Sequence, residues 1–244
     1  MISVVVPTYN EANYLSATLD SVADSNAQKE TIVVDAGSVD GTRELAEQRA
    51  SNVLLSSRRQ RAHQMNFGAQ HAHGSVLLFL HADTVLPPLA LDHIKSSVAK
   101  DQIIGGGFAR RYDSNSWFLR ITCLLAGLRT RWAGWFLGDQ AIFIRRETFE
   151  RLGGFQDLDL FEDLDLSRRM AKAGSVVTLF PPVTSSSRRF KARGEVLTTV
   201  VDVSLTLRYL VGADPNTLAK ARRVFSEEGM THGDLHVKGW TFKS

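Results

Sequence analysis

The chain opens with Ile2–Glu11, ISVVVPTYNE, an apolar run that ends in polar residues. The apolar part, Ile2–Val6, is β-branched and barely alternates with polar residues, which is typical of a strand covered on both faces. It lacks the basic segment and long apolar stretch of a signal peptide. The stretch therefore predicts a core strand of an α/β fold, with Pro7–Glu11 at its carboxyl end.

Similar apolar runs follow, separated by segments with helical spacing of apolar residues. The predicted strands are Ile2–Val6, Thr31–Val34, Val53–Leu55 and Val76–Leu80. The predicted helices are Tyr14–Ser25, Thr42–Gln48 and Ala62–Ala72. Strand–helix alternation of this kind indicates right-handed βαβ units in a parallel sheet flanked by helices.

The second half is less regular, and the change of character near residue 105 is the boundary that the sequence indicates. Its predicted strands are Gly105–Phe108, Gln140–Ile144 and Val176–Phe180, and its predicted helices are Trp117–Leu128, Phe161–Ala173 and Glu195–Val211. We therefore expect two halves, over 1–104 and 105–225, and a polar C-terminal tail over 226–244.

Bulk properties narrow the class of protein. The 244 residues are 43% hydrophobic and 23% charged, with a net charge of +3 and a pI of about 9.1. This mild positive charge suits an anionic ligand or an anionic membrane surface, and it falls short of the basic stripe of a nucleic-acid binder. Cys123 is the single cysteine, which excludes an intrachain disulfide. No run approaches the roughly 18 apolar residues of a membrane span, so we expect a cytoplasmic protein, with the inner membrane face as an alternative location.

Polar residues follow each predicted strand of the first half. They are Thr8–Glu11, Asp35–Ser38, Ser57–Arg59 and His81–Asp83. Ligands of open α/β sheets bind outside the carboxyl ends of the strands. Three of these four ends carry a carboxylate and the fourth carries arginines, which predicts a site for a phosphate-bearing ligand and a cation.

Four motifs in order resemble family 2 glycosyltransferases. They are Pro7–Glu11, Val34–Thr42, His81–Asp83 and Phe161–Asp163, and they lie within about residues 3 to 190. The resemblance implies a GT-A-type, Rossmann-like mixed sheet and transfer of a sugar, with inversion, from a nucleotide-diphosphate donor to an acceptor hydroxyl. It also implies that 1–104 is the nucleotide-sugar-binding half of one GT-A domain and that 105–225 is its acceptor-binding and catalytic half. The stretches Arg58–Asn66 and Leu80–Thr84 are also similar to a subgroup assigned to arsenosugar biosynthesis.

The departing diphosphate of such a donor calls for a divalent cation, Mn²⁺ or Mg²⁺, and hard cations prefer carboxylate oxygens. Asp83 directly follows a predicted strand and is the expected metal ligand. The family has a second acid two positions earlier, where this chain has His81. A neutral imidazole there would favour Mn²⁺ somewhat.

The resemblance places a further set of residues against the nucleotide. They are Pro7, Thr8, Tyr9, Glu11, Asp35, Gly37, Arg58, Arg61 and Ala82. Three of them, Glu11, Arg58 and Arg61, have simpler interpretations. Glu11 would complement a helix dipole, and the arginines would begin a solvated basic helix.

Asp163, with Glu162 beside it, is the candidate base that accepts the proton of the acceptor hydroxyl. The alternative is that both acids only stabilise the first turn of a helix, and Asp165 is the replacement if the register differs. The remaining candidates lie on the acceptor or diphosphate side: Asp139, Gln140, Arg168, Arg169 and Arg188.

Three other functions compete with this one. A nucleotidyltransferase would normally show a Gly-rich phosphate loop, which Pro7–Asn13 lacks. A degenerate member of the family would bind a nucleotide-sugar without turnover. A carrier-lipid transferase would dock on a bilayer through Trp117–Leu128 and Glu195–Val211, helped by Arg120, Arg129 and Arg131.

Overall fold

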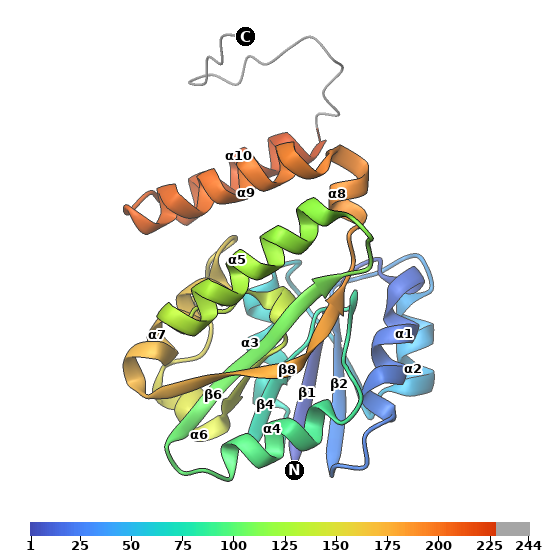
Figure 1. The fold of residues 1–244 in the computed structure, drawn as a ribbon. Coiled ribbons are helices and arrows are strands. Elements are labelled where there is room, and N and C mark those ends of the chain that lie inside the picture. The colour runs from blue at the N-terminus through green and yellow to red at the C-terminus, as the bar shows by residue number, and fades with distance from the viewer. Residues whose placement is uncertain (228–244) are drawn as a thin grey trace, which may run out of the picture.

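The computed structural model describes residues 1–227, which form a sheet of eight strands in the order β3-β2-β1-β4-β7-β6-β8-β5 (Figure 1). The first four strands in this order are mutually parallel. β7 runs antiparallel between β4 and β6, and β8 is parallel to β6. The predicted mixed sheet, largely parallel in the N-terminal half and flanked by helices, is therefore confirmed.

The elements of the first half confirm the pattern of apolar runs. The strands are β1 (Ile2–Thr8), β2 (Lys29–Asp35), β3 (Asn52–Leu55), β4 (Val76–Phe79) and the short β5 (Thr84–Val85). The helices are α1 (Ala12–Ala23), α2 (Thr42–Arg49), α3 (Arg61–Gln70) and α4 (Ala90–Val98). β5 and α4 were not predicted.

The second half contains the predicted strands and helices with different bounds, and several helices that were not predicted. Its strands are β6 (Ile103–Tyr112), β7 (Ile142–Arg145) and β8 (Ser175–Ser185). Its helices are α5 (Trp117–Ala133), the 3₁₀ turn η1 (Gly138–Gln140), α6 (Arg146–Arg151), α7 (Glu162–Ala173), α8 (Arg188–Arg193), α9 (Glu195–Leu210) and α10 (Pro215–Glu227). Gln140 was predicted to begin a strand and instead ends η1, so that boundary was wrong.

β8 continues beyond the predicted end of its strand, through Pro181 and Pro182. Its register with β6 shifts there, from Phe108↔Leu179 to Arg110↔Val183. Proline has no N–H to donate to a ladder, and an irregularity in the pairing accommodates it. The strand therefore reaches Ser185 and carries the following serines to the edge of the sheet.

The glycine run of β6 allows close packing on both sides. A Cβ at Gly106 would collide with the carbonyl of Val177 on β8, and one at Gly107 would lie 2.6 Å from the ring of Phe136. Any side chain at these two positions would push the neighbouring elements apart.

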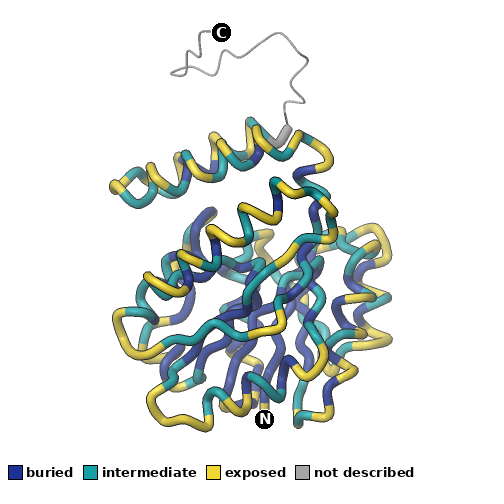
Figure 2. Tube along the Cα trace, in the orientation of Figure 1, coloured by how far each residue is buried: buried dark blue, intermediate teal, exposed yellow. Residues whose placement is uncertain are grey.

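Apolar side chains fill both faces of the sheet, as the dark centre of Figure 2 shows. Val4 and Val6 point to one face and Val5 to the other, which explains why β1 reads as a continuous apolar run. A third cluster joins α7, α9 and α10 through residues such as Leu164, Leu205 and Leu218.

The helices α5, α9 and α10 lie over the edge at which the parallel strands end, the upper edge in Figure 1. Strands from both sides of residue 105 share one sheet, and the division into 1–104 and 105–225 remains a prediction. The predicted tail, 226–244, lies outside the described residues beyond Glu227. Within residues 1–227, no helix combines the length and apolar character needed to cross a bilayer.

Candidate functional site

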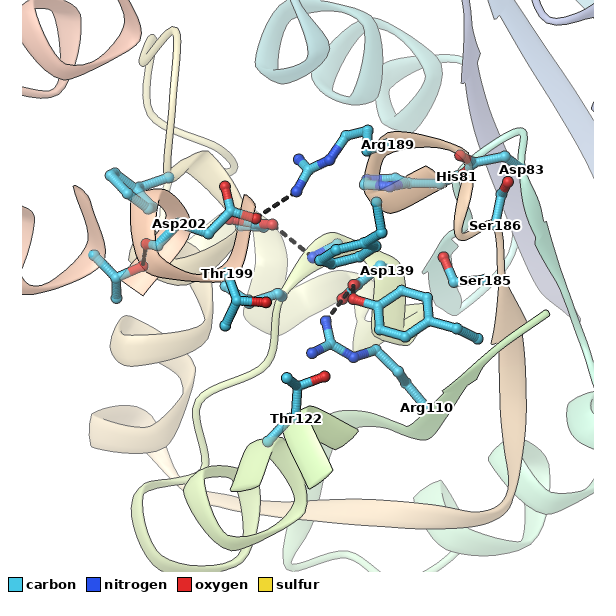
Figure 3. A pocket seen from close by; sticks show the side chains of 18 of the residues that line it. His81, Asp83, Arg110, Thr122, Asp139, Ser185, Ser186, Arg189, Thr199 and Asp202 are labelled. Atoms are coloured by element: carbon cyan, nitrogen blue, oxygen red, sulfur yellow. Dashed lines mark hydrogen bonds and ion pairs between the residues drawn. The ribbon is translucent and has the colours of Figure 1, made fainter. Parts of the chain in front are cut away.

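A pocket of about 520 Å³ lies at the carboxyl ends of the strands, beneath α5 and α9 (Figure 3). Half of the sequence-predicted site residues line it, and these come from segments far apart in the chain. They are Pro7, Glu11, Arg61, His81, Ala82, Asp83, Asp139, Asp163 and Arg188. The fold therefore brings the donor-side and acceptor-side candidates into one space.

His81 and Asp83 follow β4 and enter the pocket together (Figure 3). The Nε2 atom of His81 is buried and has no hydrogen-bond partner in the described structure. Burial and the nearby positive charge of Arg61 lower the pKa of His81, which keeps the imidazole neutral at pH 7. An unpaired ring nitrogen and a carboxylate are thus available side by side.

Arg188 bridges two of the predicted acids. Its guanidinium donates to both carboxylate oxygens of Glu11, at 2.7 and 2.6 Å, and lies 3.1 Å from Oδ2 of Asp83. It also stacks on the ring of Tyr14, 4.5 Å from its centroid. The guanidinium of Arg188 thereby connects the segment after β8 to the segments after β1 and β4. An anionic ligand could bind the same guanidinium.

Asp163, in the first turn of α7, is held by two backbone N–H groups. Its Oδ2 accepts from Gly138 and its Oδ1 from Leu164, both at 2.6 Å. Gly138 also touches the His81 ring, because a Cβ at Gly138 would collide with its Nε2 and Cε1 atoms. The turn η1 therefore positions Asp163 and His81 relative to each other.

Glu162, next to this base candidate, is buried and does not line the pocket. Its Oε1 lies 3.1 Å from Nε of Arg61. Desolvation raises the pKa of Glu162, and the charge of Arg61 opposes this rise without cancelling it. Glu162 thus orients Arg61, which lines the pocket.

Asp139 forms an ion pair with Arg110 and accepts a hydrogen bond from the Tyr112 hydroxyl at 3.4 Å. Burial opposes ionisation of this carboxyl, but Arg110 and His81 lower its pKa. Its Oδ1 is buried without a partner. Asp139 therefore presents one free acceptor oxygen.

Asp35 and Gly37 do not line the pocket. Oδ2 of Asp35 accepts from the N–H groups of Gly37 and Ser38, at 3.0 and 2.9 Å, and Oδ1 accepts from the Ser38 and Thr8 hydroxyls. Gly37 has a φ of +83°, which favours glycine. In this structure Asp35 closes the loop after β2.

The other candidates from the first half also lie outside the pocket. Arg58 pairs with Asp157 through two hydrogen bonds, at 3.2 and 2.9 Å, on the exposed surface. Tyr9 lies beneath the guanidinium of Arg59, 3.5 Å from its carbon to the ring centroid.

Gln140, Arg168 and Arg169 are likewise absent from the pocket wall. Gln140 is buried and accepts from Arg129 at 2.7 Å. Arg169 pairs with Asp165 at 2.6 Å, and Arg168 stacks on Trp135. The pairing of Asp165 leaves Asp163 as the acid of this turn that reaches the pocket.

Sequence analysis did not identify Arg110, Tyr112 and Asp202 as pocket residues, and considered Arg129 only for membrane contact. Two signals were available. Asp202 is the single charged residue between Val196 and Leu207. Thr122, Leu125, Ala126 and Arg129 fall on one helical face by their spacing.

A cation at this site would find few protein ligands. The part of the chain that the structure describes holds no cluster of three or more His, Cys, Asp or Glu arranged for a metal. The unpaired Nε2 of His81 and the carboxylate of Asp83 nevertheless fit a cation that takes its remaining ligands from phosphates and water, which is how Mg²⁺ usually binds.

The family model of glycosyl transferase family 2 matches residues 3–153, more than half of the chain. The chain belongs to this family. The match covers β1 to α6 and every candidate residue from Pro7 to Gln140. It ends before Asp163.

Curated relatives match over part of their length. The chain is 30% identical over 134 residues to glycosyltransferase AglE of Haloferax volcanii, covering 46% of this chain and 44% of that protein. It is 29% identical over 156 residues to the undecaprenyl-phosphate 4-deoxy-4-formamido-L-arabinose transferase of Edwardsiella ictaluri, covering 59% and 48%. The matched part is thus less than half of the length of these relatives.

Solved structures share the fold over more of the chain. The mannosyltransferase PcManGT from Pyrobaculum calidifontis, in complex with GDP-Man and Mn²⁺, has a TM-score of 0.63 at 24% identity and covers 93% of this chain and 70% of its own. TarS residues 1–349 of S. aureus, in complex with UDP-GlcNAc, has a TM-score of 0.59 at 16% identity and covers 76% and 58%. These likenesses confirm the expected GT-A fold.

Proposed function

We propose that this protein is an inverting glycosyltransferase that moves a sugar from a nucleotide-diphosphate donor to an acceptor hydroxyl. The observation that supports this proposal is that Asp163, His81, Asp83 and Arg188 all line one pocket. The two sides supply different chemistry, since Asp163 is a proton acceptor and the others suit a diphosphate.

The transfer requires one bond to form while another breaks. The acceptor oxygen attacks the anomeric carbon from the face opposite the diphosphate, and its proton passes to Asp163. The bond from that carbon to the diphosphate oxygen breaks, and its electron pair leaves with the nucleotide. Each carboxylate oxygen of Asp163 accepts one hydrogen bond from a backbone N–H. These bonds fix the orientation of the carboxylate and leave lone pairs free to accept the proton.

The arginines of the donor side would bind the charge of the leaving group. Arg188 pairs with Glu11 and Asp83 in this structure, and a diphosphate offers the same guanidinium a bidentate partner. Arg61 lines the pocket with Glu162 behind it. Asp83 and His81 are the residues that would hold a divalent cation, whose chemistry there is neutralisation of charge on the diphosphate.

Three finer expectations are part of this proposal. Neighbours in structure were solved with GDP-Man and with UDP-GlcNAc, so both bases enter the donor panel below. Membership of the subgroup assigned to arsenosugar biosynthesis rests on the resemblance of Arg58–Asn66 and Leu80–Thr84, and it names no substrate. Asp35 and Gly37 are expected to contact the nucleotide, Asp35 at its base or ribose.

The first experiment measures donor binding. UDP-, GDP- and dTDP-sugars with Mn²⁺ are tested by thermal shift, and hydrolysis of each donor is followed. A donor at about 100 times its Kd should stabilise the fold by about 2.7 kcal/mol and raise Tm by roughly 5 to 10 °C. Absence of a shift with every donor, with or without metal, would refute the proposal.

The second experiment tests the base. Asp163→Asn should lower transfer by about 10² to 10⁴-fold and leave the donor thermal shift unchanged. Asp157→Asn is the matched control, because it alters an exposed acid paired with Arg58 outside the pocket. Full transfer by Asp163→Asn would assign the base elsewhere, and donor binding by the wild type without transfer would indicate a binding protein.

A further inference from the structure

Two helices over the pocket expose rows of large apolar side chains. The α5 row is Trp117, Ile121, Leu124, Leu128 and Trp132, and the α9 row is Val196, Val200, Val203, Leu207 and Val211. Both rows have the spacing i, i+4, i+7, i+11, i+15, which places their members on one side of each helix. Every member is more than 40% exposed. Exposed apolar surface of this extent marks a binding surface.

The α9 row reaches the candidate active site, and on α5 the exposed Leu125 lies beside the row and lines the pocket. Leu125 of α5 and Val203 and Leu207 of α9 line the pocket, yet they remain 59, 51 and 58% exposed. Because the same side chains face both the pocket and solvent, the pocket opens between the two helices. A molecule lying on the rows would therefore extend into the space that contains Asp163.

Arg129 gives this opening an anion site. The other arginines that line the pocket each lie within ion-pair distance of a carboxylate, and within residues 1–227 Arg129 does not. It donates to the carbonyl of Trp135 at 3.0 Å and to the side chain of Gln140. Burial and the charge of Arg110 lower the pKa of Arg129, as expected for a cation without a counter-ion.

The fixed position of Arg129 relates this anion site to the base. Gln140 ends the turn η1, and Gly138 at the start of the same turn holds Asp163 through its N–H. A phosphate bound at Arg129 would thus place a neighbouring hydroxyl near Asp163. Guanidinium groups bind phosphates in a two-pronged geometry, which suits this role.

We propose that the acceptor is an amphiphilic lipid, with a headgroup that carries a phosphate and a hydroxyl. The phosphate binds Arg129, the hydroxyl faces Asp163, and the hydrocarbon chain lies along the α5 and α9 rows. This inference rests on the proposed transfer reaction and names its acceptor class. The chemical step is unchanged: the headgroup oxygen bonds to the sugar, its proton goes to Asp163, and the nucleotide leaves.

A binding assay with decanoyl lysophosphatidylglycerol tests the lipid, because this probe has glycerol hydroxyls, a phosphate and one chain. Trp117 and Trp132 are 71 and 85% exposed, so a chain along α5 should shift their fluorescence to shorter wavelength. Affinity should rise by up to about fourfold for each methylene that the surface buries. Glycerol phosphate, which lacks the chain, should give no shift, and the matched lysophosphatidylcholine should bind at least tenfold more weakly.

Variants at the pocket opening distinguish binding of the lipid's hydrocarbon chain from binding of its headgroup. Leu125→Gln with Leu207→Gln should weaken binding of the lysophosphatidylglycerol at least tenfold. Leu89→Gln is the matched control, because Leu89 is 58% exposed and lies outside the pocket wall. Arg129→Gln should abolish the preference for lysophosphatidylglycerol over lysophosphatidylcholine, and Arg129→Lys should retain part of it.

Two results would overturn the inference. One is binding that does not depend on chain length or that the double leucine variant leaves intact. The other is a dimer in light scattering that the same variant abolishes, which would make the rows an interface between copies. The nucleotide-sugar thermal shift is measured on the same samples: if it persists while lipid binding fails, the acceptor class is wrong, and if it is absent, the transfer function is wrong.

Discussion

The loop after β2 begins with Asp35 and the segment after β4 contains Asp83, and these two acids beyond parallel strands have different surroundings. Asp35 accepts four hydrogen bonds from its own loop and from Thr8. Asp83 forms an ion pair with Arg188 at 3.1 Å, and the buried Nε2 of the nearby His81 has no hydrogen-bond partner in the described structure. A carboxylate that accepts several hydrogen bonds from its own loop stabilises that loop, whereas a buried polar atom without a hydrogen-bond partner can bind a ligand. Equal positions in the topology therefore do not imply equal roles.

Among the variants that test this contrast, Gly138→Ala should have the largest effect. The new Cβ would collide with the His81 ring and lie 3.2 Å from Oδ2 of Asp163, so it would displace both groups and remove neither. Transfer should fall by about 10²-fold, as expected for a misplacement of about 1 Å, while donor binding persists. Steady-state kinetics and thermal shift check this.

The control for this variant is Gly127→Ala. A Cβ at Gly127, within α5, meets nothing within 4 Å, so stability should stay the same or rise slightly. Unchanged transfer by Gly138→Ala would show that the turn does not hold the pocket geometry.

Asp35→Asn should mainly lower stability. An amide NH₂ cannot accept the hydrogen bonds that one carboxylate oxygen accepts here, which should cost about 1–3 kcal/mol and lower Tm by several degrees. Differential scanning calorimetry measures the loss. An unchanged Tm with a raised donor KM would instead make Asp35 a ligand residue and remove the contrast with Asp83.

Glu162→Gln should have a smaller effect that depends on pH. Burial raises the pKa of Glu162 above its ordinary value of 4.5, so the folded state holds its proton more tightly than the unfolded chain. That stabilising contribution is complete below pH 4.5 and is lost as pH rises through the raised pKa. The free energy of unfolding of the wild type should therefore decrease, relative to Glu162→Gln, from pH 4.5 upward. Urea titrations at pH 4.5, 6 and 8 test this, and a difference that does not change with pH would contradict it.

Arg58→Gln should have the smallest effect. The Arg58–Asp157 pair is at least half exposed and lies outside the pocket, so its loss should cost less than about 1 kcal/mol. Donor KM should stay unchanged. Arg43→Gln, which breaks a similarly exposed pair with Glu47, is the control. A tenfold rise in donor KM for Arg58→Gln alone would extend the donor site beyond the pocket.

Much of the first half was predictable because a buried parallel strand needs an uninterrupted apolar run. Val4–Val6 and Leu77–Phe79 show this pattern, and each became a central strand. The long β8 was not predictable, because its continuation through Pro181 depends on a register shift with β6. The helices α4 and α10 were also missed, although Asp214 caps the first turn of α10 and Pro215 occupies its first position.

The sequence predicted several residues of the candidate site, but it did not predict which side chains they contact. His81, Asp83 and Asp163 were identified from motifs, and all three line the pocket. Asp139 was identified without its counter-ion, because Arg110 lies on a strand 29 residues earlier. No local pattern indicates which distant side chain will face a carboxylate.

The sequence by itself determined the sheet-forming runs, the acids at the strand ends and the family, because these depend on local spacing and on motifs of a few residues. Only the tertiary structure decided which carboxylates have their hydrogen-bonding positions filled and which can bind a ligand. That depends on contacts between distant residues such as Glu11 and Arg188. It also decided that α5 and α9 leave apolar side chains exposed at the mouth of the pocket. Helical spacing predicts that such residues share a face, but whether that face is covered depends on the packing of the whole chain.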